Sequence, residues 1–445
     1  MKPYLILTIL LLPFVSVFGS DSSFSGLTFE RHEQAKADFS EEKPLDMNFL
    51  TRKYLLGDWN GVRTRLAKEA ITTTSTWTGD ILANPIGGNK QAFTYTGSNG
   101  LDVVVDLDKY GYQGLSFVGS IVLRGGVSLA RWIGNQFPPA QVFGNQSIIL
   151  DVFYLAQKFH NGRGVVHLGR LNAGDKFLQN PLYYNYVCNA FCGNPISIFF
   201  NIPFSAYPNS TWGAYLQYQF AKRILAKFAY YNANDTLSNI KFHGLNWTFN
   251  STNGLLWITE WTYLHQTEKE DCGLPGHYKV ALWYLTGHSC RFIEGPDIGN
   301  WGWYFLFDQM VYRCGGPQSD LGLTPFIALL FAPGDRNKFP FFFTSGAVWK
   351  GLIPCRPDDK AAVGVAYGQY SSDLREVQRE AQIMGIPGRF GNQPETYELV
   401  FELNYRYQVT PWFFIQPDLQ YIANPKGFGT IPNAWVFGAQ TGLVF

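Results

Sequence analysis

The sequence predicts an all-β protein, a transmembrane antiparallel up-and-down β-barrel of about 16 strands. Three observations carry this prediction. Apolar and polar side chains alternate through residues 396–445 with a period of two, which is the period of a strand. After the N-terminal leader no run of 18 consecutive apolar residues occurs, which excludes a helical membrane protein. The connections between candidate strands alternate in length, as periplasmic turns and outer loops do in outer-membrane barrels.

The closing strands show the alternation most clearly. In the first of them Leu399, Phe401 and Leu403 lie on one face, and polar side chains share the other face: Glu398, Glu402, Asn404, Arg406 and Gln408. The last run has no tail after it and carries aromatic residues at both ends, Trp435 and Phe445. Aromatic ends suit the two interfaces of a bilayer, so we expect this run to be the strand that closes the barrel.

The N-terminus carries the pattern of an export signal. Lys2 precedes an apolar run over residues 4–18, and Val17 and Gly19 occupy the minus three and minus one positions of a cleavage site. The apolar run is too short to span a bilayer. We therefore predict a signal peptide over residues 1–19.

The segment after the signal peptide is expected to lie in the periplasm. Residues 20–52 are rich in charge and poor in large apolar side chains, which predicts a solvated segment. In residues 53–70 the apolar positions Trp59, Val62 and Leu66 fall three or four apart. This spacing predicts a short amphipathic periplasmic helix that seals one end of the barrel.

The barrel domain is expected to cover residues 71–445. Before the three closing runs the candidate strands, each of roughly strand length, are residues 71–84, 101–108, 115–124, 148–158, 164–171, 212–220, 224–232, 254–264, 276–284, 302–312, 322–331, 341–350 and 361–370. An even number of strands with short links on one side places both termini in the periplasm.

Composition limits the function classes. The chain is 46% hydrophobic and 17% aromatic, and its mean hydropathy of -0.09 fits a wall around a polar lumen as well as a secreted β protein. A formal net charge of +1 provides no field that would recruit nucleic acid, so nucleic-acid binding has no support. We predict no cofactor.

The six cysteines would meet an oxidising compartment after export. Cys188 and Cys192 lie close enough in sequence to pair across a small loop, and a zinc site there lacks nearby histidines. Up-and-down threading places Cys188, Cys192 and Cys290 at the outer side of the barrel. The same threading places the other three in periplasmic turns: Cys272, Cys314 and Cys355.

Six motifs occur in order along the chain: GDWNGVRTRL at 57–66, LGRLNAGDKF at 168–177, GLPG at 273–276, APGDRN at 332–337, KGLIP with RPDD at 350–359, and IQPDLQY at 415–421. In this order they resemble the OprB-type carbohydrate-selective porins, from about Leu55 to Phe445. The resemblance implies an outer-membrane barrel whose loops fold inward to narrow a sugar-conducting pore. Asn60, where the family commonly has Gly, and the surplus of cysteines depart from the pattern.

A sugar carries many hydroxyl groups and one apolar ring face, so a selective channel needs hydrogen-bonding side chains near aromatic surfaces. The candidate pore residues are Arg170, Asp175, Arg124, Arg131, Asp106, Asp151, Glu260 and Tyr183. The long segment 172–211 is the expected constricting loop. Arg170 and Asp175 are favoured because their motif is shared with the porins. A wide wet lumen lined by these charges, or a salt bridge at the root of the loop, explains them equally.

An enzyme is not predicted, because the seven histidines are scattered and no GxSxG, HExxH or phosphate-loop motif occurs. The leading hypothesis is passive diffusion of mono- or oligosaccharides into the periplasm, with carbohydrates and outer-membrane lipid as partners. Two alternatives stay open: a general porin for small polar solutes, and a disulfide-linked structural protein of the outer envelope. Homo-oligomers or disulfide cross-links to envelope proteins are further predicted partners.

Overall fold

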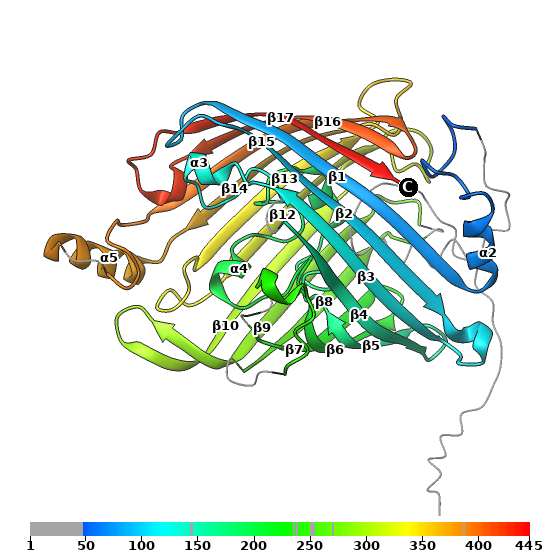
Figure 1. Cartoon of the computed structure of the whole chain (residues 1–445), viewed down its shortest axis with the longest axis horizontal. Helices are drawn as coiled ribbons and strands as arrows, with labels where there is room; N and C mark the ends of the chain where they lie inside the picture. Colours follow the sequence, from blue (N-terminus) through cyan, green and yellow to red (C-terminus); the bar gives the residue numbers. More distant parts are fainter. Residues whose placement is uncertain are drawn as a thin grey trace, which may run out of the picture.

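The computed structural model describes residues 48–142, 146–234, 236, 239–249, 254–268, 271–385 and 388–445. The predicted signal peptide and most of the predicted charged segment 20–52 lie outside the described residues. The strands form one antiparallel sheet that curls into a barrel (Figure 1). The first strand pairs with both the second and the last, so the sheet has no free edge and the barrel is closed.

The strands are β1 (Ile71–Ile86), β2 (Phe93–Asp106), β3 (Leu115–Gly126), β4 (Ser147–Phe159), β5 (Gly164–Leu171), β6 (Thr211–Ala221), β7 (Ile224–Asn232), β8 (Leu255–His265), β9 (Gly276–Arg291), β10 (Gly295–Gln309), β11 (Tyr312–Arg313), β12 (Gly322–Phe331), β13 (Phe341–Lys350), β14 (Lys360–Gln369), β15 (Tyr397–Thr410), β16 (Phe413–Ala423) and β17 (Ala434–Val444). The α-helices are α2 (Val62–Lys68), α3 (Ala130–Ile133), α4 (Ile198–Asn201) and α5 (Ser372–Met384).

The predicted strand number is confirmed. Of the 17 strands, β11 has two residues and pairs only with the first residues of β12, which leaves 17 minus 1, or 16, long strands. The predicted second strand began at residue 101, whereas β2 already begins at Phe93. Its first half carries Thr94, Thr96 and Ser98 on the inner face, and Gly97 and Asn99 interrupt the apolar alternation on the outer face.

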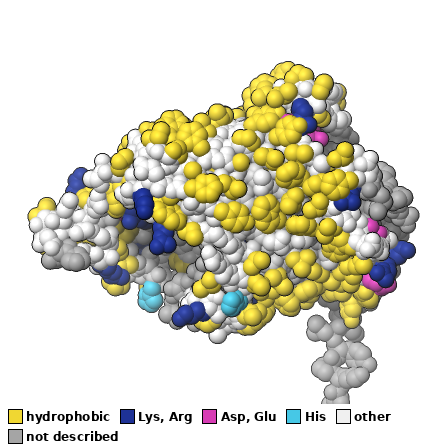
Figure 2. Space-filling view, turned by 45° about the horizontal axis from the view of Figure 1, so that its top comes forward, with side chains coloured by type: hydrophobic (Ala, Val, Ile, Leu, Met, Phe, Trp, Pro, Cys, Tyr) yellow, Lys and Arg dark blue, Asp and Glu magenta, His cyan; other side chains and the backbone are white. Residues whose placement is uncertain are grey.

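The two faces of each strand differ as the alternation predicts. On β15 the inward Glu398 and Glu402 are 0% and 1% exposed, whereas the outward Phe401 and Leu403 are 46% and 54% exposed. Figure 2 shows hydrophobic side chains spread over the wall, with most charged side chains toward its two ends. Among the described residues, no helix is long and apolar enough to cross a membrane.

The longest connections lie at one end of the barrel and the tightest turns at the other, although the outer connection 292–294 is also short. Residues 160–163, 222–223 and 411–412 are tight turns at one end, and residues 127–146 and 172–210 are long connections at the other. The N-terminal segment and the C-terminus meet at the end with the tight turns (Figure 1). Short turns mark the periplasmic end of outer-membrane barrels, so residues 48–70 and the C-terminus lie on that side.

The N-terminal helix is shorter than the predicted 53–70. Only α2 is helical, and the residues before it form turns in which Gly57, Trp59, Asn60 and Gly61 have positive φ angles. These left-handed conformations interrupt any α-helix, so the helix begins only at Val62 and not at residue 53 as predicted. The carboxylate of Asp58 still accepts a hydrogen bond from the Thr64 backbone N–H at 2.8 Å.

Arg63 joins this N-terminal segment to the first strand and to the residue that follows the last strand. Its guanidinium donates to the carbonyl of Phe445 at 2.9 Å and to the carbonyl of Thr73 at 2.8 Å. The same group stacks on Tyr54 and Trp59, at 3.8 and 4.4 Å from the ring centroids. A single side chain therefore joins the first strand, the last residue and the periplasmic segment.

We expect Arg63→Ala to lower the free energy of unfolding by roughly 3 kcal/mol, because charge-assisted hydrogen bonds and ring contacts are lost together. The measurement is the temperature at which the folded barrel converts to the slower-migrating unfolded form on a denaturing gel. Arg65→Ala is the matched control, since Arg65 is exposed on the same helix. Equal midpoints for the two variants would show that the Arg63 contacts do not stabilise the barrel.

Candidate functional site

The inner face of the barrel has two halves of different character. Strands β6 to β14 contribute mainly apolar side chains, all buried: Tyr215, Ala229, Tyr231, Leu256, Ile258, Ala281, Trp283, Tyr304, Leu306, Phe326, Ala328, Leu330, Phe342, Ala362 and Ala366. Strands β1 to β4 and β15 to β17 contribute mainly polar ones: Thr78, Asp80, Ser98, Asp102, Ser120, Arg124, Glu402, Asn404, Gln416, Gln420 and Gln440. The apolar half must be covered if the lumen holds water.

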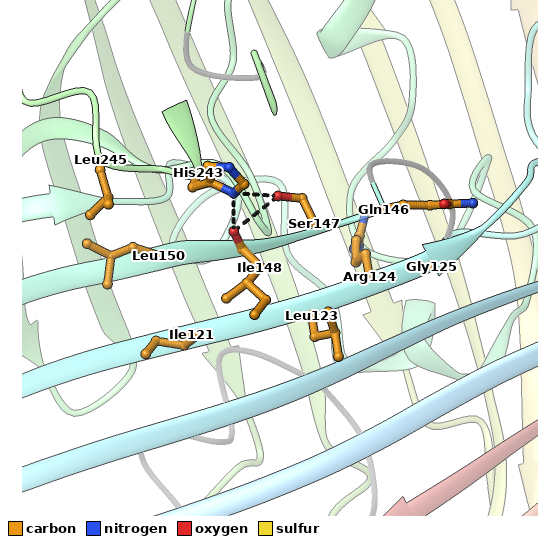
Figure 3. Close-up of a pocket in the computed structure, with 10 residues that line it drawn as sticks. All are labelled: Ile121, Leu123, Arg124, Gly125, Gln146, Ser147, Ile148, Leu150, His243 and Leu245. Atoms are coloured by element: carbon orange, nitrogen blue, oxygen red, sulfur yellow. Dashed lines mark hydrogen bonds between the residues drawn. The ribbon is translucent and has the colours of Figure 1, made fainter. Parts of the chain in front are cut away.

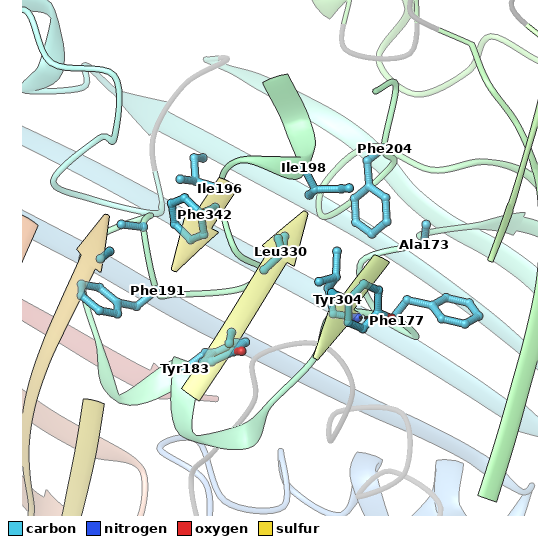
Figure 4. Packing of buried hydrophobic residues seen from close by; sticks show 14 of the residues in the cluster. Ala173, Phe177, Tyr183, Phe191, Ile196, Ile198, Phe204, Tyr304, Leu330 and Phe342 are labelled. Atoms are coloured by element: carbon cyan, nitrogen blue, oxygen red, sulfur yellow. Dashed lines mark hydrogen bonds between the residues drawn. The ribbon is translucent and has the colours of Figure 1, made fainter. Parts of the chain in front are cut away.

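The connection between β5 and β6, residues 172–210, covers the apolar half and is here called the first inward segment. Its buried side chains pack on the wall in a cluster that Figure 4 shows from close by. The Tyr183 ring lies 5.3 Å from Phe326, and the Phe177 ring lies 5.9 Å from Tyr215. This connection therefore folds into the barrel, and its role as the constricting loop stays a prediction.

The connection between β3 and β4 also folds inward, and its described residues 127–142 are called the second inward segment. Phe137 is 0% exposed and its ring lies 5.6 Å from Phe342 on the wall. Two backbone hydrogen bonds join it to the first inward segment, from Gln141 N to Val187 O at 2.9 Å and from Asn189 N to Pro138 O at 3.0 Å. The two segments therefore form one body inside the barrel.

Two carboxylates of β15 hold this body in place. Glu402 accepts the backbone N–H groups of Val187 at 2.7 Å and Cys188 at 3.0 Å. Four residues earlier, on the same face of β15, Glu398 accepts the N–H groups of Gln136 and Phe137, both at 2.7 Å. Each carboxylate thus satisfies two successive backbone donors that would otherwise be buried without acceptors.

Neighbouring wall residues bind the carbonyls of the same segments. Arg406 donates to the Tyr184 carbonyl at 2.6 Å, and the amide of Gln416 donates to the Asn185 carbonyl at 2.9 Å. On the opposite side Lys227 donates to the Lys176 carbonyl at 2.9 Å. The first inward segment is therefore fastened to two sides of the wall.

The structure brings Arg124 and Asp151 together on the polar half of the lumen. The guanidinium of Arg124 lies 4.8 Å above the ring of Tyr207, whose hydroxyl shares a 2.8 Å hydrogen bond with Ser98. Asp151 attracts Arg124 electrostatically and accepts a hydrogen bond from the Asn172 amide at 2.7 Å. These predicted residues lie where the first inward segment meets the polar wall.

Glu260 and Tyr183 lie elsewhere, beneath the first inward segment. Glu260 is 0% exposed, forms an ion pair of 2.8 Å with Lys227 and accepts the Tyr304 hydroxyl at 2.7 Å. Tyr183 is also 0% exposed, in the cluster with Phe326. Their positions favour a role in holding the segment rather than in contacting a solute.

Arg170 lies on the same face of β5 as the outward Leu168, which is 56% exposed. Its guanidinium donates to the carbonyls of Ser210 and Asn246 and lies 5.5 Å from the ring of Trp247. This position does not favour the predicted contact with a sugar. Its contacts instead join β5 to residues 246–247 of the outer connection.

The remaining predicted residues are also apart from Arg124. Asp175 is 4% exposed at the root of the first inward segment, where its charge acts on Tyr231. Asp106 accepts the Asp108 N–H at 3.0 Å and so caps a short helical turn at the periplasmic end. Arg131 is exposed on α3, near Trp132.

The predicted disulfide between Cys188 and Cys192 does not form in the structure. Both side chains are free thiols buried in the first inward segment, and the Cys188 thiol donates to the Pro138 carbonyl at 3.4 Å. Burial, assisted by the charge of Glu402, raises the pKa of both thiols well above its ordinary value.

The predicted sides of the barrel hold for the other cysteines. Cys290 lies near the outer end of β9. The other three lie at or between strand ends on the periplasmic side: Cys272, Cys314 and Cys355. Among the described residues, no group of three or more His, Cys, Asp or Glu side chains could hold a metal ion.

The comparison with known proteins agrees with this architecture. A family model described as a carbohydrate-selective porin of the OprB family matches residues 90–445. This chain belongs to that family. Its members are channels, and the family together with the barrel fold places the chain in the outer membrane.

The matches to individual relatives cover nearly the whole of this chain. Porin B of Pseudomonas aeruginosa is 28% identical over 423 residues, which cover 88% of this chain and 91% of that protein. The putative porin QuiX of Acinetobacter baylyi is 25% identical over 431 residues, with 88% and 93% covered. The high-pH structure of Pseudomonas putida OprB has a TM-score of 0.82 at 24% identity, covers 89% of this chain and is itself covered completely.

Three residues of β15 that hold the inward segments were not among the predicted site residues. Glu398, Glu402 and Arg406 stand on the polar face of the first closing run, so the alternation showed that they point into the lumen. It did not show that they bind backbone groups rather than solute. Only the structure shows that Glu398 and Glu402 are 0% and 1% exposed, which indicates that they bind protein groups and not solute.

We expect Glu402→Gln to loosen the first inward segment, because the side-chain NH₂ group of glutamine cannot accept the second backbone N–H. Losing one charge-assisted hydrogen bond costs about 1.5–3 kcal/mol. Hydrogen–deuterium exchange read by mass spectrometry should then be faster in a peptide covering residues 183–192. The control is Glu376→Gln, an exposed glutamate on α5. Unchanged exchange in Glu402→Gln would show that the carboxylate does not hold the segment.

Proposed function

We propose that this porin carries mono- or oligosaccharides into the periplasm by passive diffusion, without a cofactor or a covalent step. The observation that carries the proposal is the pair of inward segments that narrow the lumen and leave one polar wall facing them. Membership of the carbohydrate-selective porin family supports the same conclusion. A barrel without such segments would be a wide pore with little selectivity.

The chemistry of the polar wall suits a sugar. Tyr207 offers an aromatic face, and Arg124 offers hydrogen-bond donors beside it. A sugar can place its apolar ring face on the aromatic ring and its hydroxyl groups on the polar side chains. Such contacts are weak enough for release, which conduction requires.

A general porin for small polar solutes is the second candidate. The same polar wall supports it, because hydroxyl, amide and carboxylate groups also hydrate amino acids and other small solutes. Homo-oligomers and disulfide cross-links to envelope proteins stay predictions. Cys290, half-buried near the outer end of β9, is the thiol best placed for such a cross-link.

Liposome swelling with neutral sugars and with amino acids of equal size separates the two candidates. We expect faster swelling with sugars, and Arg124→Ala should reduce this preference by about fivefold because hydrogen bonds to hydroxyl groups are lost. Arg379→Ala is the control, since Arg379 is exposed on α5. Equal rates for sugars and amino acids in the unmodified protein would remove the claim of sugar selectivity and leave the general porin.

A further inference from the structure

A groove lies on the outside of the barrel, between the outward face of β3 and β4 and residues 239–247 of the outer connection. Its volume is about 780 Å³, within the range of roughly 300–1,000 Å³ that is typical of small-molecule sites. Four aliphatic side chains of the two strands form its floor: Ile121, Leu123, Ile148 and Leu150. Leu245 of the outer connection faces them (Figure 3).

The far wall of the groove is attached to β4 by its backbone. The Leu150 N–H donates to the His243 carbonyl at 2.9 Å, and His243 Nδ1 lies 2.7 Å from Ser147 Oγ and 3.0 Å from the Ile148 carbonyl oxygen. Gly244 has a φ of +74°, and a Cβ there would lie 2.2 Å from the Leu150 carbonyl oxygen. Only glycine permits this approach, so the groove has a defined wall.

The attachment is possible because β4 has an open edge at this height. Pairing between β4 and β5 begins at Phe153, so residues 147–152 have no partner from β5. The outer connection takes that place through the hydrogen bond between Leu150 and His243. An open strand edge facing lipid would leave backbone groups unsatisfied, which explains why the chain covers it.

The groove is continuous with the lipid-facing surface. Its floor residues Ile121, Leu123 and Ile148 are 47%, 51% and 58% exposed, and the outward Phe153 and Leu155 continue the same face toward the membrane centre. The polar lining residues Arg124, Gln146, Ser147 and His243 lie toward its outer end, beside the start of β4 (Figure 3). The groove is thus apolar below and polar above, in the direction of the bilayer normal.

We propose that this groove binds an acyl chain of an outer-membrane lipid, with the polar headgroup at the end marked by His243. The gradient from aliphatic floor to polar rim matches one amphiphile in one orientation. The surface around it faces lipid in the membrane, so the acyl chains are present at high concentration. A polar solute would find few hydrogen-bond partners along the floor, whereas an acyl chain held between the floor and Leu245 gains van der Waals contacts with aliphatic side chains on both sides.

Photo-crosslinking in membranes tests the proposal. The full-length protein is reconstituted in vesicles of phosphatidylethanolamine and phosphatidylglycerol that contain a phosphatidylethanolamine with a diazirine on one acyl chain. After irradiation and digestion, mass spectrometry maps the adducts. We expect adducts to concentrate on the peptides that carry Ile148, Leu150 and Leu245, at least about fivefold above other outward peptides, which corresponds to about 1 kcal/mol of preference.

Two variants fill the groove without changing its polarity, Ile148→Trp and Leu123→Trp, and each should reduce these adducts to the level of other outward peptides. Leu399→Trp makes the same change on the outward face of β15 and should leave them unchanged. Heat-dependent gel migration confirms that each barrel is folded. A uniform adduct pattern in the unmodified protein would overturn the proposal. Dimers in native mass spectrometry that both filling variants dissociate would assign the groove to a second copy instead.

Discussion

The interaction on which the rest of this structure depends is the pair of carboxylates on β15, Glu398 and Glu402. Loops normally stay at a surface because their backbone groups need partners. A loop inside a barrel is stable only if wall side chains supply those partners. Each glutamate here takes two successive backbone N–H groups of a different inward segment, and Glu398 also accepts the N–H of Lys426.

The division of the lumen into an apolar and a polar half follows from the same arrangement. Porin interiors are usually polar throughout. Here strands β6 to β14 present aromatic and aliphatic side chains inward, and the first inward segment packs on them as a soluble core would, with Phe177, Tyr183 and Phe191 fully buried. Burial of these apolar side chains therefore keeps the segment on one side of the barrel. The proposed path for solute runs along the polar wall that bears Arg124.

Much of this was predictable from the sequence, for a physical reason. Side chains of a barrel strand must alternate between lipid and lumen, so the pattern around Leu399 and Glu402 shows both the strand and its orientation. The strand number and the inward position of residues 172–210 followed from spacing and resemblance. The strand number is confirmed by the order of strands around the closed sheet, and the inward position agrees with the burial of Tyr183.

The remaining features depend on contacts between residues far apart in sequence. Arg170 shares a motif with the porins, yet it faces outward because β5 places it on the face of Leu168 and the distant Asn246 accepts its hydrogen bond. Cys188 is near Cys192 in sequence, but its thiol is directed to the Pro138 carbonyl of another connection. No local pattern records such partners, and this is why site prediction was weaker than fold prediction.

The most direct test of the central claim is single-channel conductance in a planar bilayer for the double variant Glu398→Gln, Glu402→Gln, with oligosaccharides of increasing length added as blockers. If the two carboxylates hold the constriction, the double variant conducts more current per channel and admits longer oligosaccharides than the unmodified protein. An unchanged conductance and an unchanged size limit in a correctly folded double variant would contradict the account.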